Sequence, residues 1–275
     1  MDTKITVLVD NKRDRNKGLG SEWGLSLLIE YAGKRILLDT GGSDLFIKNM
    51  KRLGMNVSDV DYAVLSHAHC DHANGIPAFF SHNTKAKFYL REGTSDNCYG
   101  KIAFLHFYAG IPHGMLSDYH DRIVMVSGDH TFMDGVYLIP HKTEGMSLIG
   151  KSGGLYRRTP QGFIADDLSH EQSLVIDTAK GLVIMNSCSH GGVINIVNEV
   201  SRTFPDKHIY ALIGGFHLFT KPASEIHDIA KSLDRMGIDL ICTGHCTKER
   251  AYGIMKKELG DKLIQMRSGL CIEIE

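Results

Sequence analysis

Histidines follow directly on four apolar segments of this 275-residue chain. These segments end just before His67, His190, His217 and His245. Each is short and rich in Val, Ile and Leu, which is typical of a buried β-strand. Ligands of open α/β sheets gather beyond the carboxyl ends of the strands, whereas unrelated core histidines would fall anywhere along them. The recurrence therefore predicts an α/β fold in which distant histidines meet at one site.

The densest group of candidate metal ligands is the segment His67-Ala68-His69-Cys70-Asp71-His72. In extended chain, residues i and i+2 point the same way, so His67 and His69 can close on one ion. Asp71 and His72 follow one turn later and can face a second ion. Such mixed imidazole and carboxylate donors suit a pair of divalent ions about 3.5–4 Å apart. A solvated histidine-rich loop is the alternative, but this segment leaves a buried strand rather than a polar tract.

Composition excludes several other classes of protein. A hydrophobic share of 43% and a formal net charge of -1 are ordinary for a globular protein and give no case for a nucleic-acid or membrane partner. No apolar run reaches the roughly 18 residues of a membrane span, and the N-terminus shows no signal-peptide pattern. Six cysteines without a compact framework argue for a reducing compartment. We therefore expect a cytoplasmic protein.

Most of the chain alternates between predicted strands and helices. The expected strands cover residues 5–9, 23–31, 34–39, 61–65, 87–90, 136–139, 173–176, 182–185, 208–213, 238–242, 262–266 and 270–274. The expected helices cover residues 44–53, 73–81, 193–202, 223–236 and 247–258. Residues 92–135 have no clear period but are rich in aromatic residues and histidine. These aromatics would either stack on a flat substrate or form a local core or dimer contact.

Several of these motifs resemble those of one known family. The His67–His72 motif at a strand exit, together with Leu37-Leu38-Asp39-Thr40-Gly41-Gly42, resembles the signature of the metallo-β-lactamase-fold hydrolases. Residues 188–192 (CSHGG), 214–218 (GGFHL) and 243–247 (TGHCT) resemble the branch of 7,8-dihydropterin-6-methyl transferases, also called ribofuranosylaminobenzene 5'-phosphate synthases. The resemblance covers nearly the whole chain. It implies a single domain, residues 1–275, with a four-layer αββα sandwich, in which residues 92–135 form a variable insertion covering the site.

The resemblance also implies two sets of ligands. His67, His69 and His190 would hold one ion, with His170 competing for the third place. Asp71, His72 and His245 would hold the other. Cys188 stands where many members have a bridging Asp, and both a ligating thiolate and a buried neutral thiol remain open. Asp39 would support the ligands through hydrogen bonds rather than ligate.

The function implied is that of a dinuclear metal-dependent hydrolase. A metal-bound hydroxide would attack a small ester or phosphoester, phosphorylated or heterocyclic, while Asp71 positions it and His217 transfers a proton. Nitrogen and oxygen ligands favour zinc, with manganese and iron open. One alternative is a pterin-dependent transferase that releases pyrophosphate; another is a non-catalytic metal-binding sensor. The expected partner is a small molecule, and a homodimer through the insertion remains open.

Overall fold

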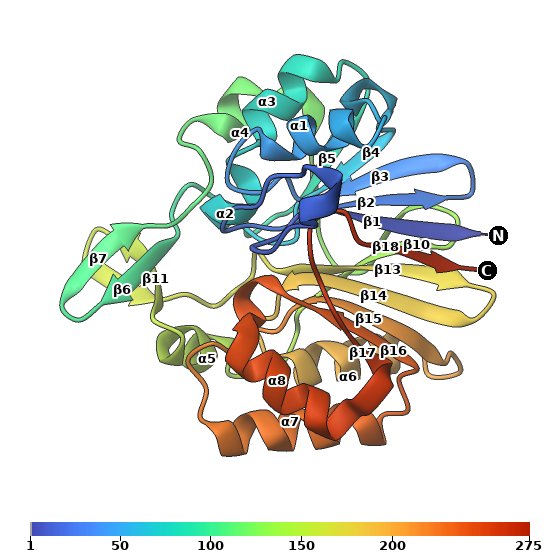
Figure 1. The fold of residues 1–275 in the computed structure, drawn as a ribbon. Helices are drawn as coiled ribbons and strands as arrows, with labels where there is room; N and C mark the ends of the chain where they lie inside the picture. Colours follow the sequence, from blue (N-terminus) through green and yellow to red (C-terminus); the bar gives the residue numbers. More distant parts are fainter. Residues whose placement is uncertain (1) are drawn as a thin grey trace.

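Two β-sheets packed face to face form the centre of the molecule, with helices on both outer faces (Figure 1). The structure is a computed structural model that describes residues 2–275. The first sheet runs in the order β18 (Cys271–Ile274), β1 (Thr3–Val9), β2 (Ser26–Tyr31), β3 (Lys34–Leu38), β4 (Tyr62–Val64), β5 (Lys87–Arg91) and β8 (Ile123–Val126). The second runs β17 (Leu263–Gln265), β16 (Leu240–Thr243), β15 (Ile209–Gly215), β14 (Gly181–Cys188), β13 (Gln172–Thr178), β10 (Val136–Pro140) and β9 (His130–Met133).

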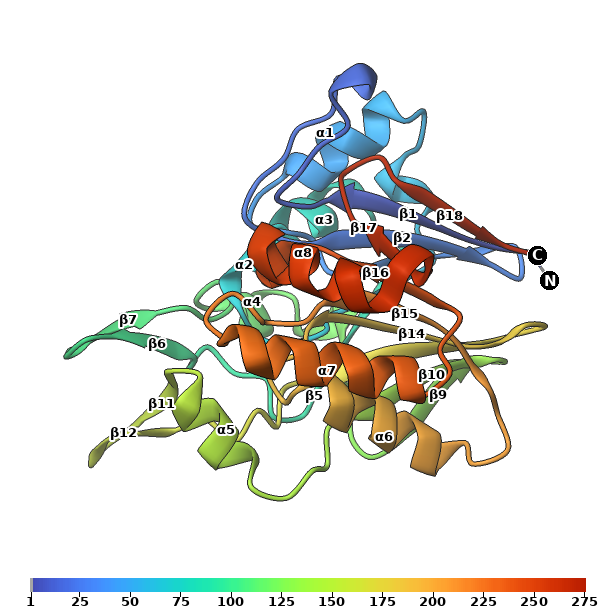
Figure 2. The same cartoon turned by 60° about the horizontal axis from the view of Figure 1, so that its bottom comes forward.

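The helices divide between the two outer faces. The first sheet is covered by α1 (Leu45–Arg52), α3 (Ile76–His82) and α4 (Met115–Asp118), and the short α2 (Cys70–Ala73) follows the exit of β4. The second sheet is covered by α6 (Val193–Thr203), α7 (Ala223–Arg235) and α8 (Lys248–Leu259), while α5 (Met146–Ser152) lies near one end (Figure 2). This arrangement is the four-layer αββα sandwich expected from the sequence.

The apolar strands are explained by burial on both sides of each sheet. Alternate residues such as Ile36 and Leu38 of β3 face the core between the sheets, and Leu37 faces α1 and α3. In the second sheet, Val183 faces inward and Ile184 faces α6 and α7. Both faces must then be apolar, so these strands read as continuous hydrophobic runs.

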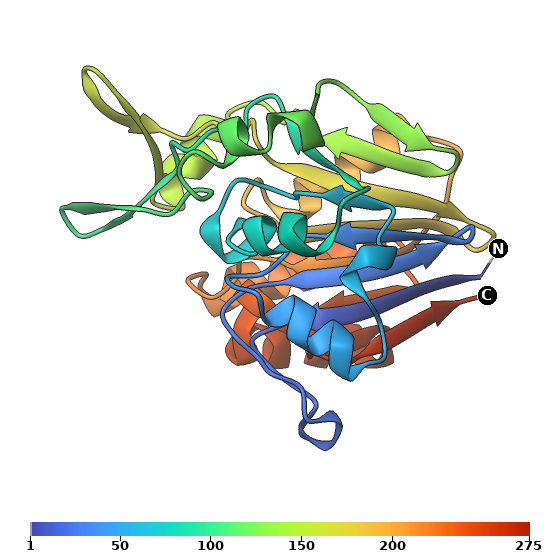
Figure 3. The same ribbon diagram turned by 90° about the horizontal axis from the view of Figure 1, so that it is seen from above.

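A small third sheet projects from the body of the protein. It runs in the order β12 (Gly162–Ala165), β11 (Leu155–Thr159), β6 (Tyr99–Ile102) and β7 (Leu105–Tyr108), and we call it the arm. The arm extends on the side of the molecule where α2 lies, opposite the chain termini (Figure 3). The pairing of Tyr156 with Tyr99, 57 residues apart, joins its two hairpins.

The predicted insertion, residues 92–135, divides among three parts of this fold. Its first half builds the hairpin β6–β7 of the arm. Its second half supplies α4 and the edge strands β8 and β9 of the two large sheets. Among residues 2–275, no helix is both long and apolar enough to cross a membrane.

Candidate metal centre

The four histidine-bearing strand exits meet at one end of the paired sheets. The imidazole centroids of His67 and His190 lie 5.0 Å apart, as do those of His72 and His245. His67 joins the two pairs, because its ring lies 4.2 Å from that of His72. Strands β14, β15 and β16 are parallel, so their carboxyl ends bring residues 190, 217 and 245 to the same edge.

The first group of donors consists of His67, His69 and His190, whose ligand atoms lie within 4.8 Å of one another. His69 Nδ1 faces His190 Nε2 at 3.1 Å, and the buried Nε2 of His67 has no hydrogen-bond partner among residues 2–275. Burial, and then the neighbouring histidines, lower the pKa of all three, to about 3 for His69. All three therefore remain neutral, which is the form of histidine that binds metal.

Asp39 determines which ring nitrogen carries the hydrogen in His67 and in His72. Its carboxylate accepts hydrogen bonds from Ser66 N (2.7 Å), Ser66 Oγ (2.6 Å) and His72 Nδ1 (2.8 Å). Since the Ser66 hydroxyl donates to Asp39, it accepts from His67 Nδ1 at 2.8 Å. His67 and His72 thus each carry hydrogen on Nδ1 and present the lone pair of Nε2 to the site.

The second group of donors consists of Asp71, His72 and His245. Asp71 Oδ2 lies 3.6 Å from His72 Nε2 and 3.3 Å from His245 Nε2. The latter nitrogen is buried and lacks an aligned hydrogen-bond partner. Burial opposes ionisation of Asp71, but His72 and His245 lower its pKa overall. Against the effect of burial, Asp71 and Asp39 raise the pKa of His72 to about 9, so without a cation Nε2 also holds a proton, which a bound cation would displace to reach the lone pair.

His245 is positioned by residues from the N-terminal part of the chain. Asp10 Oδ1 accepts a hydrogen bond from His245 N at 2.8 Å, and Asn11 Oδ1 lies 3.2 Å from His245 Nδ1. The amide of Asn11 also donates to the His245 carbonyl oxygen at 3.1 Å. Because Asn11 Oδ1 can only accept, His245 carries its hydrogen on Nδ1 and presents Nε2 to Asp71. No sequence motif pointed to Asp10 or Asn11.

Cys188 lies between the two groups. Its sulfur is 3.4 Å from His72 Nε2 and 3.1 Å from the sulfur of Cys246. Cys246 Sγ in turn accepts a hydrogen bond from His217 N at 3.2 Å. This place would suit a bridging ligand, but the Cys188 thiol donates to Cys246 and burial raises its pKa, so the neutral thiol and the ligating thiolate both remain open. The proximity of Cys246 is a feature that the sequence reading missed, although Cys246 directly follows His245.

His170 and His217 lie at the margin of the donor cluster. His170 Nδ1 accepts a hydrogen bond from Ala68 N at 3.1 Å, and its Nε2 is 3.4 Å from Asp166 Oδ2, so both ring nitrogens are engaged by the protein. This geometry favours His190 over His170 as the third donor beside His67 and His69. The ring of His217 lies 4.2 Å from that of His190, and no residue that the structure describes bonds to its buried Nδ1.

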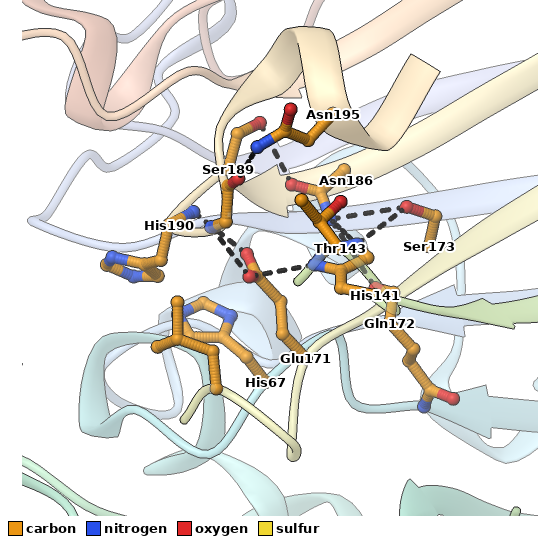
Figure 4. A network of polar contacts seen from close by, with 12 residues as sticks. His67, His141, Thr143, Glu171, Gln172, Ser173, Asn186, Ser189, His190 and Asn195 are labelled. Atoms are coloured by element: carbon orange, nitrogen blue, oxygen red, sulfur yellow. Dashed lines mark hydrogen bonds and ion pairs between the residues drawn. The ribbon is translucent and has the colours of Figure 1, made fainter. Parts of the chain in front are cut away.

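A buried carboxylate holds the loop that carries His190 (Figure 4). Glu171 accepts hydrogen bonds from His190 N and Gly191 N, both at 2.9 Å. His141 Nδ1 lies 2.8 Å from the same carboxylate, and both side chains are almost wholly buried. The other ring nitrogen of His141, Nε2, lies 3.2 Å from Ser173 Oγ. Glu171 therefore sets the position of His190 through the backbone, which no sequence motif indicated.

These donors fit two divalent cations. Lone pairs of buried ring nitrogens, at His67 and His245, have no hydrogen-bond partner within the described chain. Leaving such atoms unpaired is costly unless a cation binds them. The first group is all nitrogen and the second adds a carboxylate, with a sulfur between them, a combination suited to zinc and related metals.

The segment 109–110 of the predicted insertion contacts the ligand loop directly. Cys70 N donates to the Ala109 carbonyl oxygen at 2.9 Å, and His69 forms a β-bridge with Gly110. Some arm aromatics pack on one another, since the rings of His106 and Phe163 are stacked at 3.9 Å, whereas Phe104 and Phe107 are 83% and 47% exposed. The contacts thus agree with the local-core alternative for only part of these aromatics.

Comparison with known proteins gives matches along the whole chain. Residues 24–96 match the family described as the metallo-beta-lactamase superfamily. The 7,8-dihydropterin-6-methyl-4-(beta-D-ribofuranosyl)-aminobenzene-5'-phosphate synthase of Methanocaldococcus jannaschii is 29% identical, over 98% of this chain and 96% of that protein. An uncharacterized protein of the same organism, MJ0448, is 28% identical over 87% of this chain and 90% of its own length.

Solved structures show the same architecture. The crystal structure of Tm1679, described as a metal-dependent hydrolase of the beta-lactamase superfamily, matches with a TM-score of 0.84, 29% identity and 99% coverage of both chains. A diphosphatase from the PhnP family matches with a TM-score of 0.57 and 15% identity, covering 100% of this chain and 98% of its own, and this match shows the fold alone.

Proposed function

Since this chain has the metallo-β-lactamase fold and matches that superfamily in its ligand motif, we propose that it is a metal-dependent transferase. The reaction would join a pterin to a phosphorylated aromatic amine with release of pyrophosphate. The observation that carries this proposal is the match with the M. jannaschii synthase, which spans nearly all of both chains. The sequence motifs at residues 188–192, 214–218 and 243–247 point to the same branch.

The proposed metal ligands are the two groups of donors described above. His67, His69 and His190 would hold one ion; Asp71, His72 and His245 would hold the other, with Cys188 between them. When bound, two divalent ions, zinc before manganese or iron, would supply Lewis acidity and neutralise the charge of a departing pyrophosphate. Burial of the cluster strengthens each of these electrostatic interactions.

In the proposed reaction, the amine nitrogen bonds to the pterin methylene carbon and the bond from that carbon to the pyrophosphate oxygen breaks. The amine loses one proton in this step. A role for His217 in taking up that proton is supported by its buried, unpartnered Nδ1 beside His190. We further propose that the protein works on small molecules in the cytoplasm.

The transferase proposal is tested by measuring pterin binding through fluorescence quenching. We expect saturable binding of a hydroxymethyl-dihydropterin pyrophosphate to the zinc-loaded protein, and release of pyrophosphate when a phosphorylated aromatic amine is added. An absence of binding at about millimolar ligand would count against the proposal.

Hydrolysis of a small ester or phosphoester is the second candidate function. It is favoured by the two converging donor groups, which would also lower the pKa of a bound water. Turnover of a panel of chromogenic phosphodiesters by the zinc-loaded protein, lost on replacing His69 or Asp71 by Ala, would support it. A protein that binds zinc but neither binds pterin nor turns over any ester would instead be a metal-binding sensor.

A further inference from the structure

A cavity of about 670 Å³ opens beside the histidines of the candidate metal centre. His190 and His217 belong to its lining, together with residues of α5, α6 and α7 and of the loops that precede α6 and α7. We call this cavity the helix-end pocket. The Nδ1 atoms of both histidines are buried without a hydrogen-bond partner in the described chain, so this part of the lining offers polar groups that a ligand could satisfy.

The N-termini of two helices meet at the helix-end pocket. Its lining includes Gly192, Val193 and Asn195 at the start of α6, and Pro222 and Glu225 at the start of α7. Neither helix has a side-chain cap on its first turn. The first backbone N–H groups of both helices therefore have no intrahelical acceptor, and the two helix dipoles add positive potential at the same place.

The backbone at the start of α6 also leaves room for a ligand. Gly192 has a φ of 92°, in the left-handed region that glycine adopts without strain. Only the side-chain amide of Asn195 lies near the position that a Cβ on Gly192 would take. The N–H groups of Gly191 and Gly192 already donate to Glu171 and Ser189, so an anion at this helix N-terminus would meet the N–H groups of residues 193–195.

The remaining lining of the pocket combines aliphatic side chains, the side chains of Ser152, Ser189 and Thr220, and one partly exposed ion pair. Leu148, Ile149, Leu218 and Ile229 supply aliphatic surface. Lys221, which also lines the pocket, lies 2.7 Å from Glu225. A ligand that fits this lining has an apolar part and a compact anionic group.

We propose that the helix-end pocket binds an organic phosphate monoester. The phosphoryl group would lie at the N-termini of α6 and α7, near Lys221, and the apolar part of the molecule would pack against the aliphatic surface. The inference deepens the proposed function and rests on it, because a molecule held in this way presents its other end to His190 and His217. It identifies which part of the protein recognises the phosphate of the substrate.

The experiment measures binding of phenyl phosphate and of inorganic phosphate by calorimetry to the full-length protein, loaded with zinc and after chelation. The main variant is Asn195→Asp, which adds a negative charge to the first turn of α6. Acidic residues stabilise this position of a helix, so the variant should fold as well as Asn195→Ala, the matched control that also removes the Asn195 amide. We expect Asn195→Asp to weaken phenyl phosphate binding about tenfold and Asn195→Ala less than about threefold.

A second pair of variants removes one positive and one negative charge, each singly, from the ion pair that lines the helix-end pocket. Lys221→Gln should weaken phenyl phosphate binding and Glu225→Gln should strengthen it, each by a few-fold, since both side chains are partly exposed. Phenyl phosphate should bind more tightly than inorganic phosphate because of the aliphatic surface. Melting temperatures of all four variants check that each is folded.

Three outcomes would overturn the inference: binding that disappears on chelation, which would put the phosphate on the metals alone; equal effects of Asn195→Asp and Asn195→Ala; or no saturable binding of phenyl phosphate. Pterin binding measured on the same samples separates the two proposals. If pterin binds but the charge variants have no effect, only the helix-end pocket is refuted. If the charge variants act as expected but pterin does not bind, the transferase proposal fails alone.

Discussion

Asp39 orients histidines of the candidate metal centre but has no free carboxylate oxygen with which to bind a cation. Both of its carboxylate oxygens are taken by Ser66 and His72. It has a φ of 59°, which Asn and Asp tolerate better than most residues. Its buried position beside three polar partners is explained if its task is to hold two imidazoles in one tautomer.

The variant Asp39→Asn tests this task while keeping the backbone conformation. An amide can no longer accept from Ser66 N, Ser66 Oγ and His72 Nδ1 together, so His72 should lose its fixed tautomer. We expect zinc affinity to fall about 10–100-fold, measured by competition with a chelator. The control is Asp177→Asn, because Asp177 pairs with the exposed Lys207. Unchanged zinc affinity in Asp39→Asn would contradict the assigned role.

The close pair of sulfurs at Cys188 and Cys246 gives a second prediction at the residue scale. Their 3.1 Å separation, with both thiols buried, sets them up for a disulfide when no metal is bound. Burial raises the pKa of Cys188; for Cys246, burial acts the same way, but Cys188 and His245 lower its pKa overall. A thiolate beside a thiol is the arrangement from which disulfides form, given an oxidant.

Diamide treatment of the chelated protein should therefore oxidise two thiols to one disulfide, with the two electrons and two protons passing to diamide. Thiol counting after denaturation should show the loss of two thiols, and prior loading with zinc should prevent it. The variant Cys246→Ala should lose none. Equal oxidation with and without zinc would show that Cys188 does not contact the metal.

At the scale of elements, the exit loop of β14 depends on a carboxylate from the start of β13. Glu171 receives two backbone N–H groups of residues 190–191, and this contact fixes the direction in which His190 leaves its strand. In α6, Glu199 plays a comparable structural part, because its carboxylate accepts from Lys142 N at 2.8 Å. Both carboxylates are buried, but only Glu171 holds a donor of the metal centre.

We therefore expect Glu171→Gln and Glu199→Gln to differ. Glu171→Gln should lower the free energy of unfolding by about 1–3 kcal/mol, since a Gln amide leaves one of the two N–H groups at residues 190–191 without an acceptor. Glu199→Gln should lower it less, since the one oxygen of Glu199 that accepts hydrogen bonds can be kept as the amide oxygen. Only Glu171→Gln should also weaken zinc binding, because His190 loses its fixed position. Chemical denaturation of the chelated proteins measures the first quantity and chelator competition the second. Equal zinc affinity in the two variants would argue against this role for Glu171.

The strands that could be predicted from the sequence are those buried on both faces. Residues 36–38 and 183–185 are continuously apolar because each sheet packs against the other sheet on one face and against helices on the other. The histidines that follow such strands could also be predicted, because each lies within a few residues of its strand in the sequence. The arm was missed because its strands of four or five residues are partly exposed on both faces and mix charged with apolar residues, as in Lys101-Ile102 and Tyr156-Arg157. Contacts such as Asn11 with His245 join residues 234 apart, so no local pattern announces them.

At the scale of the whole molecule, the arm exposes apolar side chains that do not pack against the rest of the protein. One face carries the packed aromatics His106, Tyr156 and Phe163. By the strand register, Ile102 and Leu105 pair on the other face, where they are 69% and 63% exposed. Contiguous apolar surface on a projecting element is typical of an interaction site. We retain the homodimer through the insertion, residues 92–135, as a proposal, and place its contact on Ile102 and Leu105, the part of the insertion that lies in the arm.

The homodimer proposal predicts that Leu105→Lys makes the protein monomeric. A charge at the centre of a buried apolar contact would cost several kcal/mol unless it is paired, whereas the same change on the exposed arm of a monomer would cost little. The matched control is Met125→Lys, because Met125 lies on the edge strand β8 and is 40% exposed. Light scattering coupled to gel filtration should give a dimer mass for the unaltered protein and for Met125→Lys, and a monomer mass for Leu105→Lys. A monomeric unaltered protein at its highest soluble concentration would refute the dimer and leave the arm free to approach a substrate.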